Sequence, residues 1–265
     1  MEKIGIEVWD RMEIAQKQCA FWRFPSQSIY VERLATEWHV LCLPETNDTK
    51  EARRGILSRG KKPLSSQWRH YLLNKNSPVQ PDPALPDRPV VVRPDRDLTL
   101  LPGESARFFL EIPVWFRLSA AGGRKTRIFE EPMHVFSKTW FGDPVTGELC
   151  YALAARLHQG LDSIEPTAFR AICPLLISND SDTDLAFEKI CIHAEHLSVF
   201  RGPRRLWANS LNVIFKGSDQ TTQIQIVPAA PDFEKDLVEV SGARVLADSW
   251  NIKKTFSMLK YFTDF

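Results

Sequence analysis

Three side chains with metal-binding chemistry alternate along one short segment: Cys191, His193 and Glu195. Alternate residues of a β-strand project from the same face, so these three would lie side by side, with His196 on the opposite face. A thiolate, an imidazole and a carboxylate are all ligands that Zn²⁺ accepts. The sequence indicates no fourth donor, so a half-buried strand with solvated histidines is the simpler interpretation, and both interpretations stay open.

Two further stretches approach known ligand-binding motifs but lack essential positions. Residues 55–62 match a phosphate-binding P-loop up to the last position, where Lys62 replaces the hydroxyl residue that holds Mg²⁺. Residues 180–184 have the acidic spacing that opens an EF-hand loop, but Leu185 stands where the loop needs glycine and Cys191 where it needs glutamate. The sequence therefore predicts a solvated basic loop at the first place and a turn between strands at the second.

Signatures of enzymatic chemistry are absent from the sequence. There is no G-x-S-x-G nucleophile elbow, and none of the five cysteines has the context of a catalytic thiol. Glu130 and Glu131 are adjacent, so on a strand they would point to opposite faces and could not act as paired carboxylates. We therefore predict a protein that is not an enzyme and assign it no catalytic residues, no metal ligands and no cofactor.

Basic side chains are concentrated between residues 50 and 75, where Glu51 is the only acid. Over the whole chain 34 basic residues face 33 acidic ones and no nucleic-acid-binding motif occurs, so nucleic acid is not an expected partner. The basic stretch is either solvated surface or a patch that binds an acidic or phosphorylated protein. The residues predicted to contact a partner are Arg53, Arg54, Lys61, Lys62, Trp68, Arg204, Arg205, Phe256 and Leu259.

The elements that must position these residues have the pattern of short strands. Apolar segments separated by Gly, Pro, Asn and Asp turns recur along the chain at a spacing of about 8–12 residues, and 8 Trp with 16 Phe supply the side chains of an aromatic core. The fold class predicted is all-β and sandwich-like, with two packed β halves. The segments expected are 1–80 (an N-terminal β segment), 81–160 (the first half) and 161–265 (the second half).

Helices are expected at two places. Residues 45–80 combine the basic stretch with a weak helical apolar pattern near its end, which predicts a basic, partly helical insertion. Close to the C-terminus, Ile252, Phe256 and Leu259 recur at steps of three and four residues, which predicts an amphipathic helix. Such a helix either packs on its own sheet or docks into a groove of a partner.

Residues 136–158 hold the clearest local signal for antiparallel strands. Two apolar segments flank the sequence Gly142-Asp143-Pro144-Val145-Thr146-Gly147. Gly supplies positive φ, Pro presets its own φ and Asp bonds to the neighbouring backbone, so this composition favours a tight connection. The stretch predicts a β-hairpin.

Cysteine usage and hydropathy bear on the cellular compartment. Five cysteines without a C-x-x-C pair are poor material for a disulfide framework. The N-terminus lacks the apolar core of a signal peptide, and no run reaches the ~18 apolar residues of a membrane span. We therefore expect a soluble cytoplasmic protein.

Several structural motifs lie in the middle of the chain. A Leu101-Pro102-Gly103 turn precedes a long apolar strand that holds Pro113, and Ser137-Lys138-Thr139-Trp140-Phe141-Gly142 leads through Gly147 into Cys150-Tyr151. Another strand follows over residues 173–179. On these motifs, residues 85–230 resemble the prokaryotic domain-of-unknown-function family number 432, although Trp140-Phe141-Gly142 stands where a Leu-Tyr-Gly type sequence is expected.

The resemblance implies a β-rich fold without established catalytic residues. Genes of that family often neighbour those of small-conductance mechanosensitive channels, which implies a regulatory subunit that binds the cytoplasmic domain of such a channel and lies at the membrane only through that partner. The alternative function is a β-sandwich module that binds a small molecule, a sugar or an anion. Both functions are compatible with a homo-oligomer.

Overall fold

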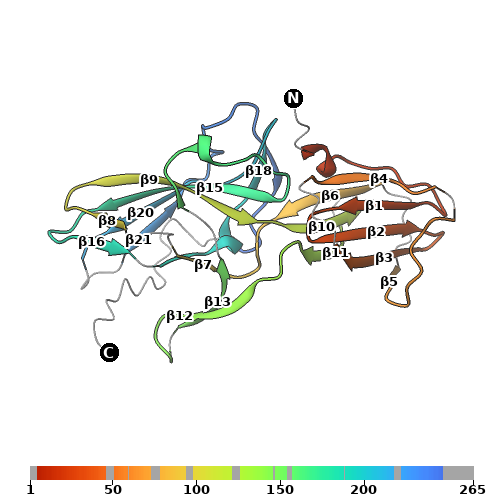
Figure 1. The fold of residues 1–265 in the computed structure, drawn as a ribbon, viewed down its shortest axis with the longest axis horizontal. Coiled ribbons are helices and arrows are strands. Elements are labelled where there is room, and N and C mark those ends of the chain that lie inside the picture. Colours follow the sequence, from red (N-terminus) through yellow and green to blue (C-terminus); the bar gives the residue numbers. More distant parts are fainter. Residues whose placement is uncertain are drawn as a thin grey trace. The chain divides into compact units, whose positions relative to one another are not determined.

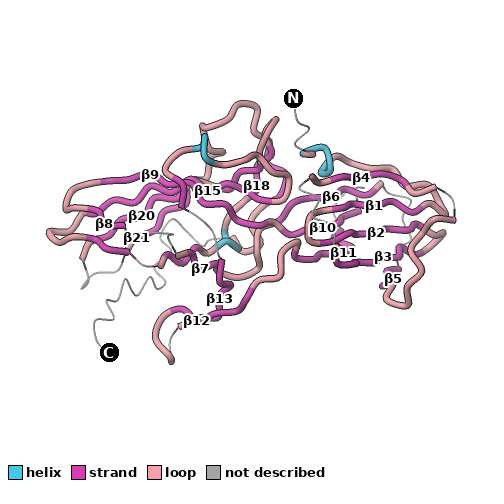
Figure 2. The backbone as a smooth tube through the Cα atoms, in the orientation of Figure 1, coloured by secondary structure: helices cyan, strands magenta, loops and turns pink. Residues whose placement is uncertain are grey.

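The computed structural model describes residues 5–45, 51–58, 60–72, 78–93, 98–120, 126–145, 147–153, 157–187, 189–217 and 222–246. Over these residues the chain forms 22 strands and three 3-10 helices of three or four residues (Figures 1 and 2). The predicted all-β class is confirmed. No helix in this part of the chain is both long and apolar enough to cross a membrane.

The chain divides into two compact units, neither of which is contiguous in sequence. Unit 1 holds Met1–Ala84, Val114–His134 and Pro166–Phe169, and unit 2 holds Leu85–Pro113, Val135–Glu165 and Arg170–Phe265.

The described residues of unit 1 form one 3-10 helix and two antiparallel sheets. Its five-stranded sheet has the order β4-β1-β2-β3-β5 and its three-stranded sheet the order β11-β10-β6. The elements are η1 (Ile6–Trp9), β1 (Cys19–Arg23), β2 (Gln27–Arg33), β3 (Glu37–Pro44), β4 (Arg53–Ile56), β5 (Arg69–Leu72), β6 (Val79–Ala84), β10 (Trp115–Ala120) and β11 (Thr126–Pro132).

Aromatic side chains join the two sheets of unit 1. Phe116 on β10 lies 5.4 Å from Trp22 on β1 and 6.0 Å from Phe24, measured between ring centroids. Trp9 of η1 completes the cluster at 5.9 Å from Phe116. The indole nitrogen of Trp22 donates to the carbonyl of Val8 at 3.1 Å, so burial of this large side chain leaves its donor satisfied.

Unit 2 is organised around β15, which pairs with β9 along one edge and with β19 and then β20 along the other. Its sheets are an eight-stranded one around β15, a four-stranded one of order β12-β13-β7-β17, and the pair β16-β8. The elements are β7 (Val90–Val92), β8 (Leu98–Leu100), β9 (Ser105–Pro113), β12 (Ser137–Phe141), β13 (Glu148–Leu153), β14 (Leu157–His158), η2 (Leu161–Ser163), β15 (Arg170–Asn179), β16 (Leu185–Phe187), β17 (Ile190–Ile192), η3 (Ala194–His196), β18 (Val199–Arg201), β19 (Leu206–Ala208), β20 (Leu211–Phe215), β21 (Gln223–Ile226) and β22 (Val238–Ser241).

The expected basic helical insertion is wrong over the residues of this stretch that the structure describes. Residues 53–56 and 69–72 form β4 and β5, the two edge strands of the five-stranded sheet. Leu72, part of the supposed helical stripe, is 83% exposed, whereas Trp68 packs on the cluster around Leu41. β4 pairs with β1 and β5 with β3, and this tertiary pairing overrides a weak local pattern. The expected C-terminal helix lies outside the described residues.

The aromatic cluster of unit 1 makes a test of this packing possible. Phe116→Ala should lower the free energy of unfolding by about 3–5 kcal/mol, because it removes a fully buried ring that contacts both sheets. Leu72→Ala, at an exposed position of the same unit, should change it by no more than about 0.5 kcal/mol. Urea denaturation of both variants measures the difference; similar losses in the two would contradict the packing described.

Candidate functional site

The β12–β13 hairpin, confirmed as an antiparallel pair, presents two chemically different faces. Trp140 pairs with Leu149 and Lys138 with Tyr151 across the strands, so these side chains share one face. Trp140 is 52% exposed and Leu149 37%. Phe136 extends this surface, since its ring stacks on Tyr151 at 4.9 Å. We call Phe136, Trp140, Leu149 and Tyr151 the aromatic face.

The turn of the hairpin holds Trp140 in place. The indole nitrogen donates to the carbonyl of Asp143 at 3.0 Å, and the Gly147 N–H donates to the same carbonyl at 2.7 Å. Gly142 has φ 99°, which favours glycine. A Cβ on Gly147 would lie 2.5 Å from the indole nitrogen and 2.6 Å from two carbonyl oxygens, so only glycine fits below the ring.

Tyr151 is fixed at the base of the aromatic face. Its hydroxyl donates to Asp87 at 2.8 Å. Burial, the hydrogen bond to Asp87 and the charge of Asp87 raise the pKa of Tyr151 to about 12, so the phenol stays neutral. The face therefore combines an anchored, half-buried base with an exposed tryptophan.

One edge of this sheet also lacks a neighbour among the described strands. β12 is the terminal strand of the order β12-β13-β7-β17, and in Figure 1 the hairpin extends away from the eight-stranded sheet of its unit. An edge strand with exposed apolar side chains is a surface on which another strand can pair.

The opposite face of the hairpin contributes Glu148 and Cys150 to a cluster of carboxylate, thiol and imidazole side chains. Cys150 on β13 and Cys191 on β17 are buried, with their sulfur atoms 3.8 Å apart. His193 Nε2 lies 3.3 Å from Glu148 Oε1, and His193 Nδ1 lies 3.0 Å from Glu195 Oε1. The structure thus collects Cys191, His193 and Glu195, as the sequence pattern had suggested, and adds two residues of β13.

The local geometry of this group differs from the prediction. β17 ends at Ile192, and the 3-10 helix η3 follows, so the three side chains do not alternate along one strand. His196, expected on the other face, has its Nε2 4.0 Å from Glu195 Oε1 because the tight helical turn gathers side chains that a strand would separate.

Nearby side chains shift the pKa values of His193 and Cys191. Burial lowers the pKa of His193, but the hydrogen bond to Glu195 and the charges of Glu148 and Glu195 outweigh burial, so the pKa is raised overall. The contact with Cys150, burial and the two carboxylates raise the pKa of the Cys191 thiol far above its usual range.

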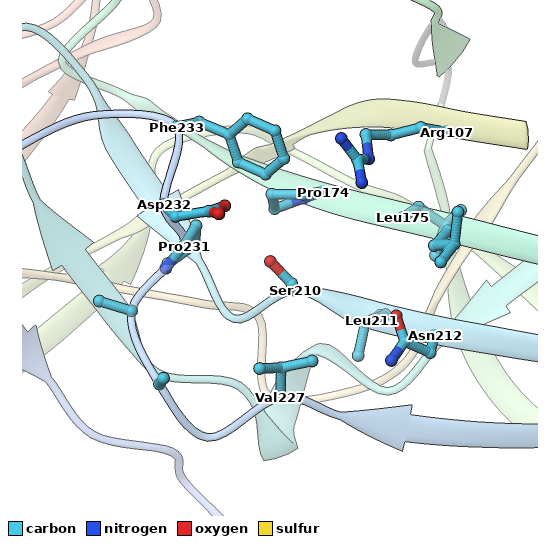
Figure 3. A pocket seen from close by; sticks show the side chains of 13 residues that line it. Arg107, Pro174, Leu175, Ser210, Leu211, Asn212, Val227, Pro231, Asp232 and Phe233 are labelled. Atoms are coloured by element: carbon cyan, nitrogen blue, oxygen red, sulfur yellow. The ribbon is translucent and has the colours of Figure 1, made fainter.

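A pocket of about 350 Å³ lies on the large sheet of unit 2, beneath the segment that follows β21 (Figure 3). The guanidinium carbon of Arg107 lies 5.4 Å from the centre of the Phe233 ring, within the range of a cation–π contact. Polar groups come from Ser210, Asn212 and Asp232, and the apolar lining includes Pro174, Leu175 and Val227. The pocket thus offers a cation, a carboxylate, an amide and a hydroxyl beside an aromatic ring.

Of the residues predicted to contact a partner, those in unit 1 are partly neutralised by neighbours. Arg53 forms an ion pair with Glu51 at 3.0 Å, and Arg54 donates to the carbonyl of Asp10 at 2.6 Å. Lys61 is exposed.

Lys62 and Trp68 lie together. The Lys62 ammonium is 2.8 Å from Glu32 and 5.4 Å from the centre of the Trp68 ring. Trp68 is half-buried against its own sheet, so it contributes to packing within unit 1.

The remaining predicted contact residues belong elsewhere in the chain. Arg204 is exposed, and Arg205 donates to the carbonyl of Ile164 at 3.2 Å; both lie in unit 2. Phe256 and Leu259 lie outside the described residues. The nine predicted residues therefore do not form one patch within a unit over the part of the chain that the structure describes.

A second histidine group in unit 1 has no signal in the sequence. His39 on β3 and His70 on β5 are directly opposite each other, with ring centroids 3.9 Å apart. Glu37 Oε2 lies 2.8 Å from His39 Nε2 and 3.7 Å from His70 Nδ1. Only the register between β3 and β5, which are 31 residues apart at the histidines, reveals this arrangement.

Two glycines of unit 2 test the geometry of the hairpin. Gly147→Ala should lower the free energy of unfolding by about 1–3 kcal/mol, because the added methyl group overlaps the Trp140 ring and backbone carbonyls. Gly160→Ala is the matched control, since a Cβ there meets nothing within 4 Å, and it should be neutral or slightly stabilising. Chemical denaturation compares them; equal stability of both variants would contradict the turn described.

Comparison with known proteins gives a family and no function. No curated protein and no solved structure shows significant similarity to this chain. The family described as "Protein of unknown function (DUF432)" matches residues 8–260, which cover most of both units and the whole β12–β13 hairpin. The chain therefore belongs to the DUF432 family.

Proposed function

We propose that the protein is a non-enzymatic interaction subunit that binds a protein partner through the aromatic face and the free edge of β12. The observation that carries this proposal is the exposed Trp140, held by its hydrogen bond to Asp143 on a strand with one edge unpaired by the described strands. Tryptophan is enriched among the residues that contribute most to binding at protein interfaces.

The partner segment that fits this surface is an extended strand with apolar side chains at alternate positions. Pairing with β12 would supply backbone hydrogen bonds, and every second side chain of the added strand would lie beside Lys138 and Trp140 of β12. Val135, before β12, and Val145, in the turn of the hairpin, are further exposed apolar side chains, at 90% and 89%. Because the turn is already ordered, binding would require little rearrangement of the hairpin.

The first partner to test is the cytoplasmic domain of a small-conductance mechanosensitive channel, the partner that the family resemblance implied. In this role the protein would be a regulatory subunit in the cytoplasm, at the membrane only through the channel. The partner-binding residues would then be those of the aromatic face.

Binding should depend on Trp140. With the full chain and a detergent-solubilised channel, Trp140→Ala should raise Kd about tenfold or more, equivalent to about 1.4 kcal/mol. Leu101→Ala removes a side chain of the same unit that is 57% exposed and should leave Kd unchanged. Microscale thermophoresis gives both values. No binding by the wild-type chain, or equal effects of the two substitutions, would refute the proposal.

The pocket around Arg107 favours a second function, the binding of a small anion or sugar. Arg107 supplies a positive charge to an anionic group, and Phe233 offers a ring for an apolar or sugar face. Ser210, Asn212 and Asp232 would complete the hydrogen bonds to hydroxyl groups.

Thermal unfolding with candidate ligands tests this second function. An anionic sugar, glucuronate, at saturating concentration should raise the Tm of the wild type, because a ligand that binds only the folded state stabilises it. Arg107→Ala should abolish the shift, whereas Arg93→Ala, an exposed arginine of unit 2 outside the pocket, should retain it. A shift that survives Arg107→Ala, or the absence of any shift with sulfate, glucose and glucuronate in the wild type, would exclude the pocket as the binding site.

A further inference from the structure

We infer that Glu148, Cys150, Cys191 and His193 form a binding site for one Zn²⁺ ion in unit 2. This inference is independent of the proposed function. The four residues read as two short motifs, Glu-x-Cys on β13 and Cys-x-His at the end of β17. Carboxylate oxygen, thiolate sulfur and imidazole nitrogen are all donors through which proteins bind zinc.

Two distances between donor atoms agree with the edges of a zinc tetrahedron. Zn–S bonds of about 2.3 Å place two sulfur atoms about 3.8 Å apart, and Cys150 Sγ and Cys191 Sγ are 3.8 Å apart. Zn–N and Zn–O bonds of about 2.0–2.2 Å place nitrogen and oxygen about 3.3–3.5 Å apart, and His193 Nε2 and Glu148 Oε1 are 3.3 Å apart.

Three of the four donors converge as one group, and His193 Nε2 adjoins this group through its 3.3 Å contact with Glu148 Oε1. A carboxylate oxygen of Glu148 and the two sulfur atoms all lie within 4.8 Å of one another. Both cysteines are buried, at 0% and 1% exposure, and the His193 side chain is 15% exposed, so three of the four donors are held away from bulk water. A site of this kind is rigid because strands, not loops, supply three of its ligands.

The strand order explains how residues 41 positions apart meet. β7 lies between β13 and β17, with Val91 directly opposite Cys191. Val91, Cys150 and Cys191 pack in one cluster on the same face of the sheet. A valine on the middle strand is small enough for the two cysteine side chains to approach each other above it.

Glu195 supplies the outer contact that zinc-bound histidines typically have. Its Oε1 atom lies 3.0 Å from His193 Nδ1, so the Nδ1–H donates to that carboxylate, and Nε2, which lies beside Glu148, is the ring nitrogen that a metal would take in place of its proton. Carboxylate–histidine pairs of this type set the imidazole tautomer and its orientation toward the metal. Glu195 is therefore a positioning residue, and His193 a ligand.

Four protein donors complete a tetrahedron, so the site is structural, with no open position for a substrate. The ion would connect β13 to β17 across β7 and hold the base of the β12–β13 hairpin. A disulfide is the competing arrangement of the two cysteines, but a sulfur–sulfur separation of 3.8 Å is much longer than the ~2.05 Å of a disulfide bond.

Metal analysis of the untagged full chain, purified with a reducing agent and without chelators, tests the inference. Plasma mass spectrometry should find about one zinc per chain in the wild type and a loss of at least tenfold in Cys191→Ser. Cys173→Ser is the matched control, because Cys173 is equally buried but lies on β15, away from the group, and it should keep its zinc. A wild type with no zinc that also fails to bind added Zn²⁺ would overturn the inference, as would a Cys150–Cys191 disulfide in the reduced preparation.

Cobalt substitution provides a readout that does not depend on the folding of a variant. Co²⁺ bound to the wild type should show thiolate-to-cobalt charge-transfer bands and the intense visible bands of a tetrahedral site. Glu148→Gln should weaken Co²⁺ binding and Glu195→Gln should do so by about 10–100-fold, while the thiolate bands persist in both at saturation. Visible bands of an octahedral site without thiolate absorption in the wild type would refute the ligand set.

Discussion

The two-residue alternation of β13 is the constraint on which the functional surface of this protein depends. Leu149 and Tyr151 project to one side of the strand, and Glu148 and Cys150 to the other. A shift of register by one residue would move Glu148 and Cys150 to the exposed face of the sheet. The same shift would move Leu149 and Tyr151 to the inner face. Pairing with β12 on one edge and β7 on the other holds the register.

The two faces support each other physically. The inner face buries Cys150 against Val91 and Cys191, which anchors β13 in its sheet. With that side anchored, the outer face can remain exposed and ordered, with Tyr151 tied to Asp87 and the Trp140 ring to the hairpin turn. A binding surface built in this way needs little ordering when a partner arrives, which favours affinity.

Local signals predicted several elements correctly. The turn composition of residues 142–147 indicated the hairpin, because Gly, Pro and Asp act on their immediate neighbours. The helix expected near Trp68 was wrong because a short, weak apolar pattern cannot compete with strand pairing to β3. Cys191, His193 and Glu195 were recognised as donors, but their alternation on a strand was wrong because the strand ends at Ile192.

By itself the sequence determined the all-β class, the hairpin and the chemical types of the donors, since these follow from composition and from residues close together in the chain. Only the tertiary structure decided which residues meet. Glu148 and Cys150 approach Cys191 and His193 because β13 and β17 both pair with β7, one on each edge. His39 meets His70 because β5 pairs with β3. Such contacts depend on the order and register of strands distant in sequence, which no local pattern specifies.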